Sequence, residues 1–203
     1  MDTLEAIRNR RAIRAYDPNH RISDAELHTM LSAARMAPSA FNIQHCRFVV
    51  VRDPELRREL RKVAWDQAHV TDASALVVIC ADRDAWKDNP TRYFNGAPDD
   101  VKERMAGLIK SYYEGREWVQ QDETMRSCGL AGQTLMLAAT AMGYQSCPMD
   151  GFDYDAVGRL INLPENHVVA MFVVIGKGTE AALPRVGKLP DSEVILTDRF
   201  PAA

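Results

Sequence analysis

Apolar residues recur at the three- and four-residue spacing of an amphipathic helix in several stretches of the chain. The first stretch follows Asp2 and the second follows Ser23, and in both a Glu stands three residues further on. This pattern predicts a capping box at each helix start. The first helix should end near Arg10, and Pro38 should end the second. Further helices are expected after Asp53-Pro54, over residues 101–112 and 122–142, and between Asp153 and Pro164.

Three other stretches are continuously apolar and rich in β-branched residues, which predicts buried strands over residues 48–51, 75–80 and 168–175. A sheet made of such strands is covered on both of its faces. The helices bunch together rather than alternate strictly with the strands, which favours an α+β fold over a doubly wound one. Neither an internal repeat nor a linker divides residues 1–203, so we expect a single domain.

Two segments depart from this regular pattern. Residues 84–98 contain two prolines and a glycine and are expected to form an irregular excursion. The stretch 122–142 holds many small residues, is apolar over much of its circumference, and ends before Gly143, a typical C′ residue. Such a helix is buried, either at the centre of the chain or against a second subunit.

Composition and charge narrow the class of protein. With 46% hydrophobic and 26% charged residues, the chain is typical of a soluble globular protein and unlike disordered or collagen-like sequences. The net charge of −3 argues against broad nucleic-acid binding. Residues 1–62 nevertheless carry 12 basic and 8 acidic side chains, an excess that indicates either an anionic ligand or a solvated basic face.

The cysteines and histidines do not indicate a metal site. The four cysteines, at positions 46, 80, 128 and 147, form no C-x-x-C pair, and the five histidines are scattered. Met1 is followed directly by a helix start, and no apolar run reaches the roughly 18 residues of a membrane span. We therefore expect reduced cysteines and a cytoplasmic location.

The usual nucleotide and hydrolase signatures are absent from the sequence. There is no G-x-G-x-x-G after a strand, no phosphate-binding P-loop, no G-x-S-x-G and no H-E-x-x-H. Five other segments carry polar chemistry: residues 10–14, 37–44, 66–69, 149–153 and 183–190. Arg10 and Arg14 would share a helical face and could grip a phosphate. Taken singly, each segment is better explained by a solvated surface or an ordinary turn than by a binding site.

Taken together, the order and spacing of these segments resemble the nitroreductase family, which are dimeric flavin mononucleotide (FMN) oxidoreductases. The start Arg10-Arg11-x-x-Arg14-x-Tyr16 is similar to that family's opening motif, and residues 38–44 are similar to its Pro-Ser-Ser-x-Asn-x-Gln segment. The other matching segments are Asp72-Ala73-Ser74, Gly143-Tyr144, Gly151-Phe152-Asp153 and the final Pro-Arg and Lys-Leu-Pro of residues 184–190. The resemblance implies a central, mostly antiparallel sheet flanked by helices, with the long helix at a dimer interface.

The resemblance also implies a set of FMN-binding residues. Those assigned to the phosphate are Arg10, Arg11, Arg14, Arg185 and Lys188, with Ala12 in the same motif. Pro38, Ser39, Ala40 and Asn42 would approach the isoalloxazine from the partner subunit, and Asp66 and His69 would face its pyrimidine edge. Backbone N–H groups around Asp150 and Gly151 would point towards flavin N5.

Several positions depart from the family pattern. Ala12 and Ala40 stand where serine is common, and Asp66 is an acid where an amide or glycine is usual. Asp66 can accept a hydrogen bond from flavin N3–H but would oppose negative charge on the reduced ring. Protonation of His69 would offset that charge.

The implied activity is two-electron transfer from NADH or NADPH through flavin N5 to a nitroaromatic, a quinone or a related acceptor. Both substrates would use one site in turn, and no catalytic side chain is required. Residues 84–124 would cover that site with their aromatic side chains, which could equally be ordinary packing. The alternatives are a flavin or enone reductase on the same fold and a non-catalytic flavin-binding module.

Overall fold

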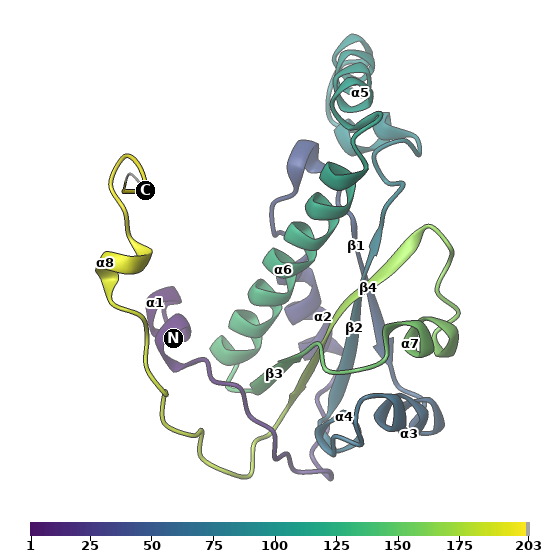
Figure 1. Ribbon diagram of the computed structural model, residues 1–203. Coiled ribbons are helices and arrows are strands. Elements are labelled where there is room, and N and C mark those ends of the chain that lie inside the picture. The colour runs from purple at the N-terminus through teal and green to yellow at the C-terminus, as the bar shows by residue number, and fades with distance from the viewer. Residues whose placement is uncertain (202–203) are drawn as a thin grey trace.

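Four strands form one antiparallel sheet in the order β1-β2-β4-β3 in the computed structural model, which describes residues 1–201 (Figure 1). The strands are β1 (Cys46–Val51), β2 (Ala75–Asp82), β3 (Gln145–Met149) and β4 (His167–Gly176). The helices are α1 (Thr3–Asn9), α2 (Asp24–Ala34), α3 (Pro54–Val63), α4 (His69–Asp72), α5 (Asp99–Tyr113), α6 (Glu117–Ala141), α7 (Tyr154–Leu160) and α8 (Asp191–Val194), with short 3₁₀ helices η1 (Ala40–Asn42) and η2 (Pro90–Phe94). The α+β class and the antiparallel sheet are as predicted.

The predicted helix starts are present. The Asp2 carboxylate accepts a hydrogen bond from the backbone N–H of Glu5 at 2.8 Å, and Ser23 and Glu26 form a complete capping box. Asp153 caps α7 in the same way, by accepting from the N–H of Ala156. Each such cap satisfies an N–H that the helix itself cannot pair, which is worth about 1 kcal/mol of helix stability.

Alternating side chains of the central strands enter two separate cores, as expected for a sheet covered on both faces. Leu76 and Val78 of β2 pack with residues of α3 and α7, whereas Val77 and Ile79 pack with residues of α2 and α6. Every residue of β2 is buried. Figure 1 shows α6 on one side of the sheet and α3 and α7 on the other.

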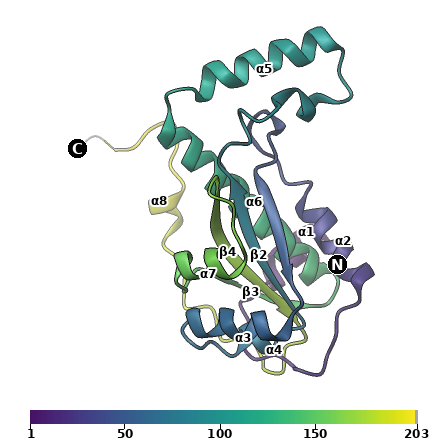
Figure 2. The same ribbon diagram turned by 90° about the vertical axis from the view of Figure 1, so that its right-hand side faces the viewer.

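The excursion has a small core of its own. Ile109 and Tyr113 of α5 pack with Ile43, Ala85 and Val119, and this cluster is separate from the two cores of the sheet. Figure 2 shows α5 crossing one end of the molecule, with α3 and α4 at the other end. The aromatic residues of the excursion stack on one another and on Phe41, so part of their role is ordinary packing.

Strand β3 was not predicted from the sequence. The long helix also begins earlier than predicted. β3 has five residues and contains Pro148, which is unfavourable inside a sheet because it cannot donate a ladder hydrogen bond. β3 lies at the edge of the sheet, where proline is tolerated. Helix α6 begins at Glu117 rather than near Asp122, because its first turn packs Val119 into the core of the excursion.

Residues 12–16 run along the sheet between α1 and α2. Ala12 forms a parallel bridge with Ser146 of β3, and Tyr16 forms an antiparallel bridge with Gly178 just after β4. Gly176 permits this close approach, since a Cβ there would lie 2.9 Å from the Tyr16 ring and 3.0 Å from the backbone nitrogen of Ser74. The arginine-rich segment is thereby held against the sheet.

After Gly178 the chain leaves the sheet, contacts α1 and the following arginines through Leu183 and Arg185, and then runs outward. In Figure 1 this segment and α8 run apart from the sheet and its helices. Its apolar side chains are exposed to solvent: Leu183, Val186, Leu189, Val194, Ile195 and Phe200. A segment with this much exposed apolar surface is typical of a protein that associates with another chain.

Candidate functional site

The arginine cluster is extended rather than helical. Helix α1 ends at Asn9, and Arg10 already has non-helical backbone angles (φ −58°, ψ 123°). The expectation that Arg10 and Arg14 share a helical face is therefore wrong. They still share a side, because residues two and four apart in an extended segment point the same way. Ile13 of the same segment is buried, and its N–H donates to the carbonyl of Ser146 at 3.1 Å.

The charges of Arg10 and Arg14 act on buried groups of the sheet and of α4. Burial raises the pKa of the Cys147 thiol on β3, and the positive charges of Arg14 and Arg10 partly offset this rise. Burial also lowers the pKa of His69 at the start of α4, and the nearby charge of Arg14 lowers it further. Arg14 therefore lies close to both β3 and α4, which come from opposite halves of the chain.

His69 is an orphaned polar side chain beside this cationic segment. It is only 5% exposed, and its Nε2 has no hydrogen-bond partner among residues 1–201. Because its pKa is lowered, the ring is neutral near pH 7 and does not supply the positive charge expected from the sequence. A buried ring nitrogen without a partner is available to a ligand.

Asp66 is held in a tight turn between α3 and α4. Trp65 and Asp66 both adopt left-handed backbone angles (φ 55° and 52°), a conformation that costs a non-glycine residue about 1–2 kcal/mol. The Asp66 carboxylate accepts a hydrogen bond from Nε of Arg61 at 2.7 Å. The positive charge that balances Asp66 thus comes from Arg61, a residue that the sequence analysis did not single out.

Residues 150 and 151 meet this turn. Nε2 of Gln67 donates to the carbonyl of Gly151 at 3.1 Å, and the N–H of Asp153 donates to the carbonyl of Val63 at 2.9 Å. Asp150 is exposed beside them. The end of β3 and the α3–α4 turn therefore lie in contact with each other.

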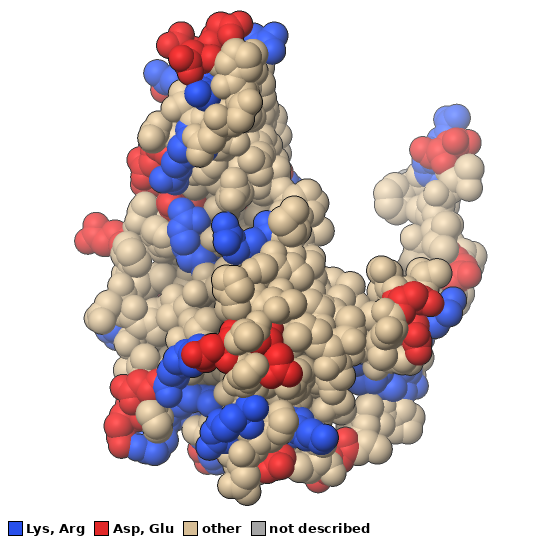
Figure 3. Space-filling view, turned by 180° about the vertical axis from the view of Figure 1, so that it is seen from behind, with Lys and Arg blue, Asp and Glu red and all other residues tan. Residues whose placement is uncertain are grey.

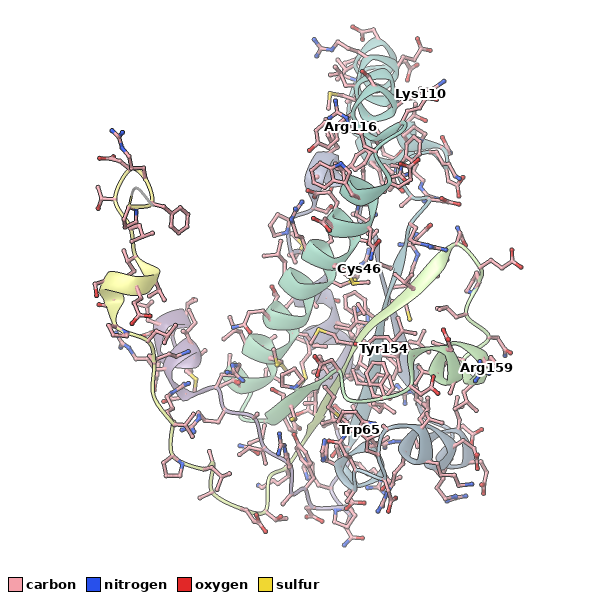
Figure 4. The ribbon with its side chains drawn as sticks, viewed as in Figure 1. Cys46, Trp65, Lys110, Arg116, Tyr154 and Arg159 are labelled. Carbon is pink, nitrogen blue, oxygen red and sulfur yellow. The ribbon has the colours of Figure 1, made fainter. Side chains whose placement is uncertain are left out.

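Trp65 covers Gly151 and was missed in the sequence analysis. A Cβ at Gly151 would lie 2.6 Å from the Trp65 ring, yet 76% of this tryptophan is exposed. Figure 4 shows Trp65 beside the α3–α4 turn and Tyr154 at the start of α7. The Tyr154 ring lies 4.5 Å from that of Phe152. In the sequence, the one signal that points to Trp65 is its position directly before Asp66.

The segment with Pro38, Ser39, Ala40 and Asn42 lies elsewhere in the same chain. Nδ2 of Asn42 donates to the carbonyl of Tyr93 at 2.9 Å, which places this segment beside η2. Oγ of Ser39 accepts from the N–H of Gln44 at 2.9 Å. In Figure 1 the N-terminal end of α6 lies next to α5, whereas β3 meets the C-terminal end of α6. One chain therefore does not bring residues 38–42 to the arginine segment.

A cavity of about 430 Å³ opens beside residues 38 and 39. Its wall includes three arginines, Arg35, Arg47 and Arg92, and the half-buried Cys46. Arg47 is held in place by an ion pair, in which its guanidinium donates to the buried Asp82 carboxylate at 3.1 Å. Figure 3, which views the molecule from behind, shows Lys and Arg side chains gathered below the α5 end.

The two cations of the C-terminal segment differ in placement. Nη2 of Arg185 donates to the carbonyls of Arg8 and Arg10, at 2.9 and 3.3 Å, and Arg11 donates to the carbonyl of Leu183. Lys188 is exposed and forms no ion pair within residues 1–201. Arg185 therefore joins the arginine segment and Lys188 does not.

This cationic cluster lacks internal counter-charges. None of Arg10, Arg11, Arg14 and Arg185 forms an ion pair with a carboxylate in the described part of the chain, although ten such pairs occur elsewhere in it. No group of three or more His, Cys, Asp or Glu side chains in the described residues could hold a metal ion. The arrangement is suited to an anionic organic ligand.

Known proteins resemble this chain over nearly its whole length. The model of the nitroreductase family matches residues 7–177. Protein DrgA of Synechocystis is 47% identical over 182 residues, which cover 90% of this chain and 87% of DrgA. An NADH dehydrogenase of Thermus thermophilus is 33% identical over 205 residues, covering 97% and 96% of the two chains.

The fold is also shared with solved structures. The crystal structure of an Exiguobacterium sibiricum protein in complex with FMN matches with a TM-score of 0.90 at 29% identity, and the match covers 98% of each chain. The chain belongs to the nitroreductase family. The resemblance found in the sequence motifs is thus confirmed. Within residues 1–201, no helix combines the length and the apolar character that crossing a membrane requires.

The buried histidines predict a specific dependence of stability on pH. The pKa values of His69 and His45 lie below the ordinary 6.5 in the folded chain, mainly because of burial. Their contribution is complete above about pH 6.5 and is lost as the pH falls below it, since the unfolded chain then binds protons that the folded chain does not. We expect His69→Asn to show a smaller loss of Tm than the wild type between about pH 7.5 and pH 5.

Thermal unfolding of both proteins across this range checks the prediction. His28→Asn, which replaces an exposed histidine on α2, is the matched control and should keep the wild-type slope. An identical slope for His69→Asn and the wild type would contradict it.

Proposed function

We propose that this protein is a homodimeric FMN-dependent oxidoreductase that uses NADH or NADPH to reduce nitroaromatics, quinones or related acceptors. The observation that carries the proposal is the juxtaposition of Arg10, Arg14 and Arg185 with Nε2 of His69, since within residues 1–201 these arginines pair with no carboxylate and this nitrogen has no hydrogen-bond partner. The FMN complex of the Exiguobacterium protein and the name of the Thermus relative support the choice of flavin and nicotinamide.

The ribityl phosphate is assigned to the cationic segment. Guanidinium groups bind phosphate oxygens through two parallel N–H donors, and Arg10 and Arg14 lie on one side of an extended segment held to β3. Arg11 and Arg185 stand beside them through their bonds to the facing backbone. Lys188 would have to move to take part, and Ala12 contributes backbone only.

The isoalloxazine is assigned to the α3–α4 turn and the end of β3. Bound there, it supplies hydride transfer at N5, and the protein supplies binding and orientation. Asp66 and His69 face its pyrimidine edge, and the Arg61 guanidinium reduces the repulsion between Asp66 and a negatively charged ring. The backbone N–H groups of Asp150 and Gly151 would be directed towards N5, and Trp65, which packs against Gly151, would lie beside the ring.

A second copy of the chain would complete the site. Residues 38–42 lie at the α5 end of α6, away from the arginine segment, so they reach a flavin only from a partner. Helix α6 exposes Trp118, Met125 and Leu130, and the segment after Gly178 is also exposed. A dimer formed along α6 would cover this apolar surface.

Both substrates would occupy the same open flavin face in turn. The nucleotide must leave before the acceptor enters, which predicts ping-pong kinetics. No side chain is assigned as a catalytic acid or base, because solvent can deliver the protons. Trp65 lies at this face, and the excursion of the partner, residues 84–124, would cover it.

The visible spectrum of the purified protein tests the central claim. We expect a yellow protein whose visible flavin absorbance bleaches anaerobically with NADH or NADPH and returns when a quinone is added. A flavin that stays oxidised with both nucleotides would favour the non-catalytic binding module. Protein that remains colourless after FMN is added would overturn the proposal.

Arg14→Glu tests the phosphate assignment. Reversing this charge should weaken FMN binding by at least about 100-fold, because a favourable charge-assisted contact becomes a repulsive one. The thermal stabilisation that FMN gives should fall with it. Titration of the flavin-free proteins with FMN measures both effects, with Arg159→Glu on the exposed face of α7 as the control. Unchanged affinity in Arg14→Glu would remove Arg14 from the site.

Leu130→Glu tests the dimer. This leucine is 47% exposed on α6, so a carboxylate there should leave the single chain folded but would be buried without a partner in a dimer. We expect the wild type to elute as a dimer and the variant as a monomer with reduced flavin content. Light scattering measures the mass, and Arg159→Glu, on the opposite side of the sheet in Figure 4, should remain dimeric. A dimeric Leu130→Glu protein would place the interface elsewhere.

A further inference from the structure

Two free cysteines from distant parts of the chain lie in contact. Sγ of Cys46, the first residue of β1, is 3.5 Å from Sγ of Cys128 in the middle of α6. The S–S bond length is about 2.05 Å, so the two sulfur atoms need to approach by about 1.5 Å.

Only one of the two thiols is open to small molecules. Cys46 is half-buried and lines the cavity of about 430 Å³ beside residues 38 and 39. Cys128 is buried behind it, with its Sγ 3.6 Å from the backbone carbonyl of Cys80. Figure 4 shows Cys46 between α6 and the sheet. A reagent entering this cavity therefore meets Cys46 first.

The two thiols also differ in acidity. A hydrogen bond joins the two thiols, and this contact together with the charge of Arg47 lowers the pKa of the Cys46 thiol despite its partial burial. The same hydrogen bond and burial raise the pKa of Cys128. Cys46 is thus the better nucleophile, because the thiolate is the reactive form.

The remaining cysteines provide natural comparisons. Cys80 packs with Leu76 and Val78 on the other face of the sheet, and burial raises its pKa to about 12. Burial also raises the pKa of Cys147, which belongs to that same core. Within residues 1–201, Cys46 and Cys128 are the only two whose sulfur atoms lie within bonding reach of each other.

We propose that Cys46 and Cys128 are a redox modification site, at which a hydroperoxide entering the cavity converts the two thiols into a reversible disulfide. The Cys46 thiolate attacks the peroxide, forming an S–O bond and releasing water or an alcohol, so that Cys46 becomes a sulfenic acid. The Cys128 thiol then attacks this sulfur and releases water. Overall, two thiols lose two hydrogen atoms and the peroxide O–O bond is reduced. A thiol reductant reverses the change.

The bond would fasten the start of β1 to α6. Residues 37–45 lead directly into Cys46 and form one wall of the cavity, so oxidation would restrict the segment proposed to approach the partner's flavin. It would also close a loop of the intervening residues, which raises the melting temperature by restricting the unfolded chain. The site is independent of the proposed FMN function, because it needs neither flavin nor nicotinamide.

The test is peptide mapping of the full-length protein after treatment with hydrogen peroxide. Trypsin places Cys46 in peptide 36–47 but leaves Cys128 and Cys147 together in peptide 127–159, so the mapping uses the Cys147→Ala variant. We expect a cross-linked 36–47/127–159 pair that dithiothreitol separates, with Cys80 still reduced. The oxidised protein should melt several degrees higher than the reduced one.

Two single variants test the order of attack, and a third, Cys80→Ala, is the control. Cys128→Ala should stop the reaction at a Cys46 sulfenic acid, which dimedone traps, whereas Cys46→Ala should leave Cys128 reduced, and Cys80→Ala should behave as the wild type. Three results would overturn the proposal: Cys46 oxidised to a sulfinic acid without a cross-link while Cys128 is present, a cross-link to another cysteine, or no loss of Cys46 thiol while free glutathione in the same solution is oxidised.

Discussion

The pairing of residues 12–16 with the sheet is the constraint on which the rest of the site depends. The bridges to Ser146 and Gly178 hold an extended, arginine-rich segment against β3 and the end of β4. Gly176 makes this possible by leaving room for the Tyr16 ring. The cations next to these bridges therefore have a fixed backbone, and they face α4 and the end of β3 without a carboxylate partner among the residues that the structure describes. A helix ending in the same arginines would be free to fray into solvent.

Charge balance explains the unusual acid in the site. Asp66 lies in a strained turn, and its carboxylate is paired with Arg61 on the preceding helix. His69, buried and neutral near pH 7, contributes a ring nitrogen rather than a charge. Asp66 and His69 thus have distinct physical roles. The charge of Asp66 is neutralised by Arg61, and His69 has a buried ring nitrogen without a hydrogen-bond partner within residues 1–201.

The two ends of helix α6 lie beside different groups of candidate functional residues. One end meets β3 and the arginine segment, and the other meets α5, η1 and the cavity beside Cys46. A single chain keeps these regions apart, so a flavin site that uses both needs two chains. The same helix carries Cys128 on its buried face and Leu130 on its exposed face, which puts a redox-sensitive contact and a candidate subunit interface within one turn of each other.

The α+β class, the capped helix starts, the three strongly apolar strands and, through the motifs, the family could all be predicted from the sequence. These are local signals, because caps act within one turn and buried strands need apolar side chains at every position. Strand β3 was not predicted because it is short and contains Pro148, which is unfavourable in a strand. Its pairing with β4 stabilises it as a strand. Other features became visible only in the folded chain. Arg10 and Arg14 share one side of an extended segment, and Arg61 neutralises Asp66. Trp65 covers Gly151, and Cys46 contacts Cys128. Each of these depends on contacts between elements, about which the spacing of residues along one chain carries no information.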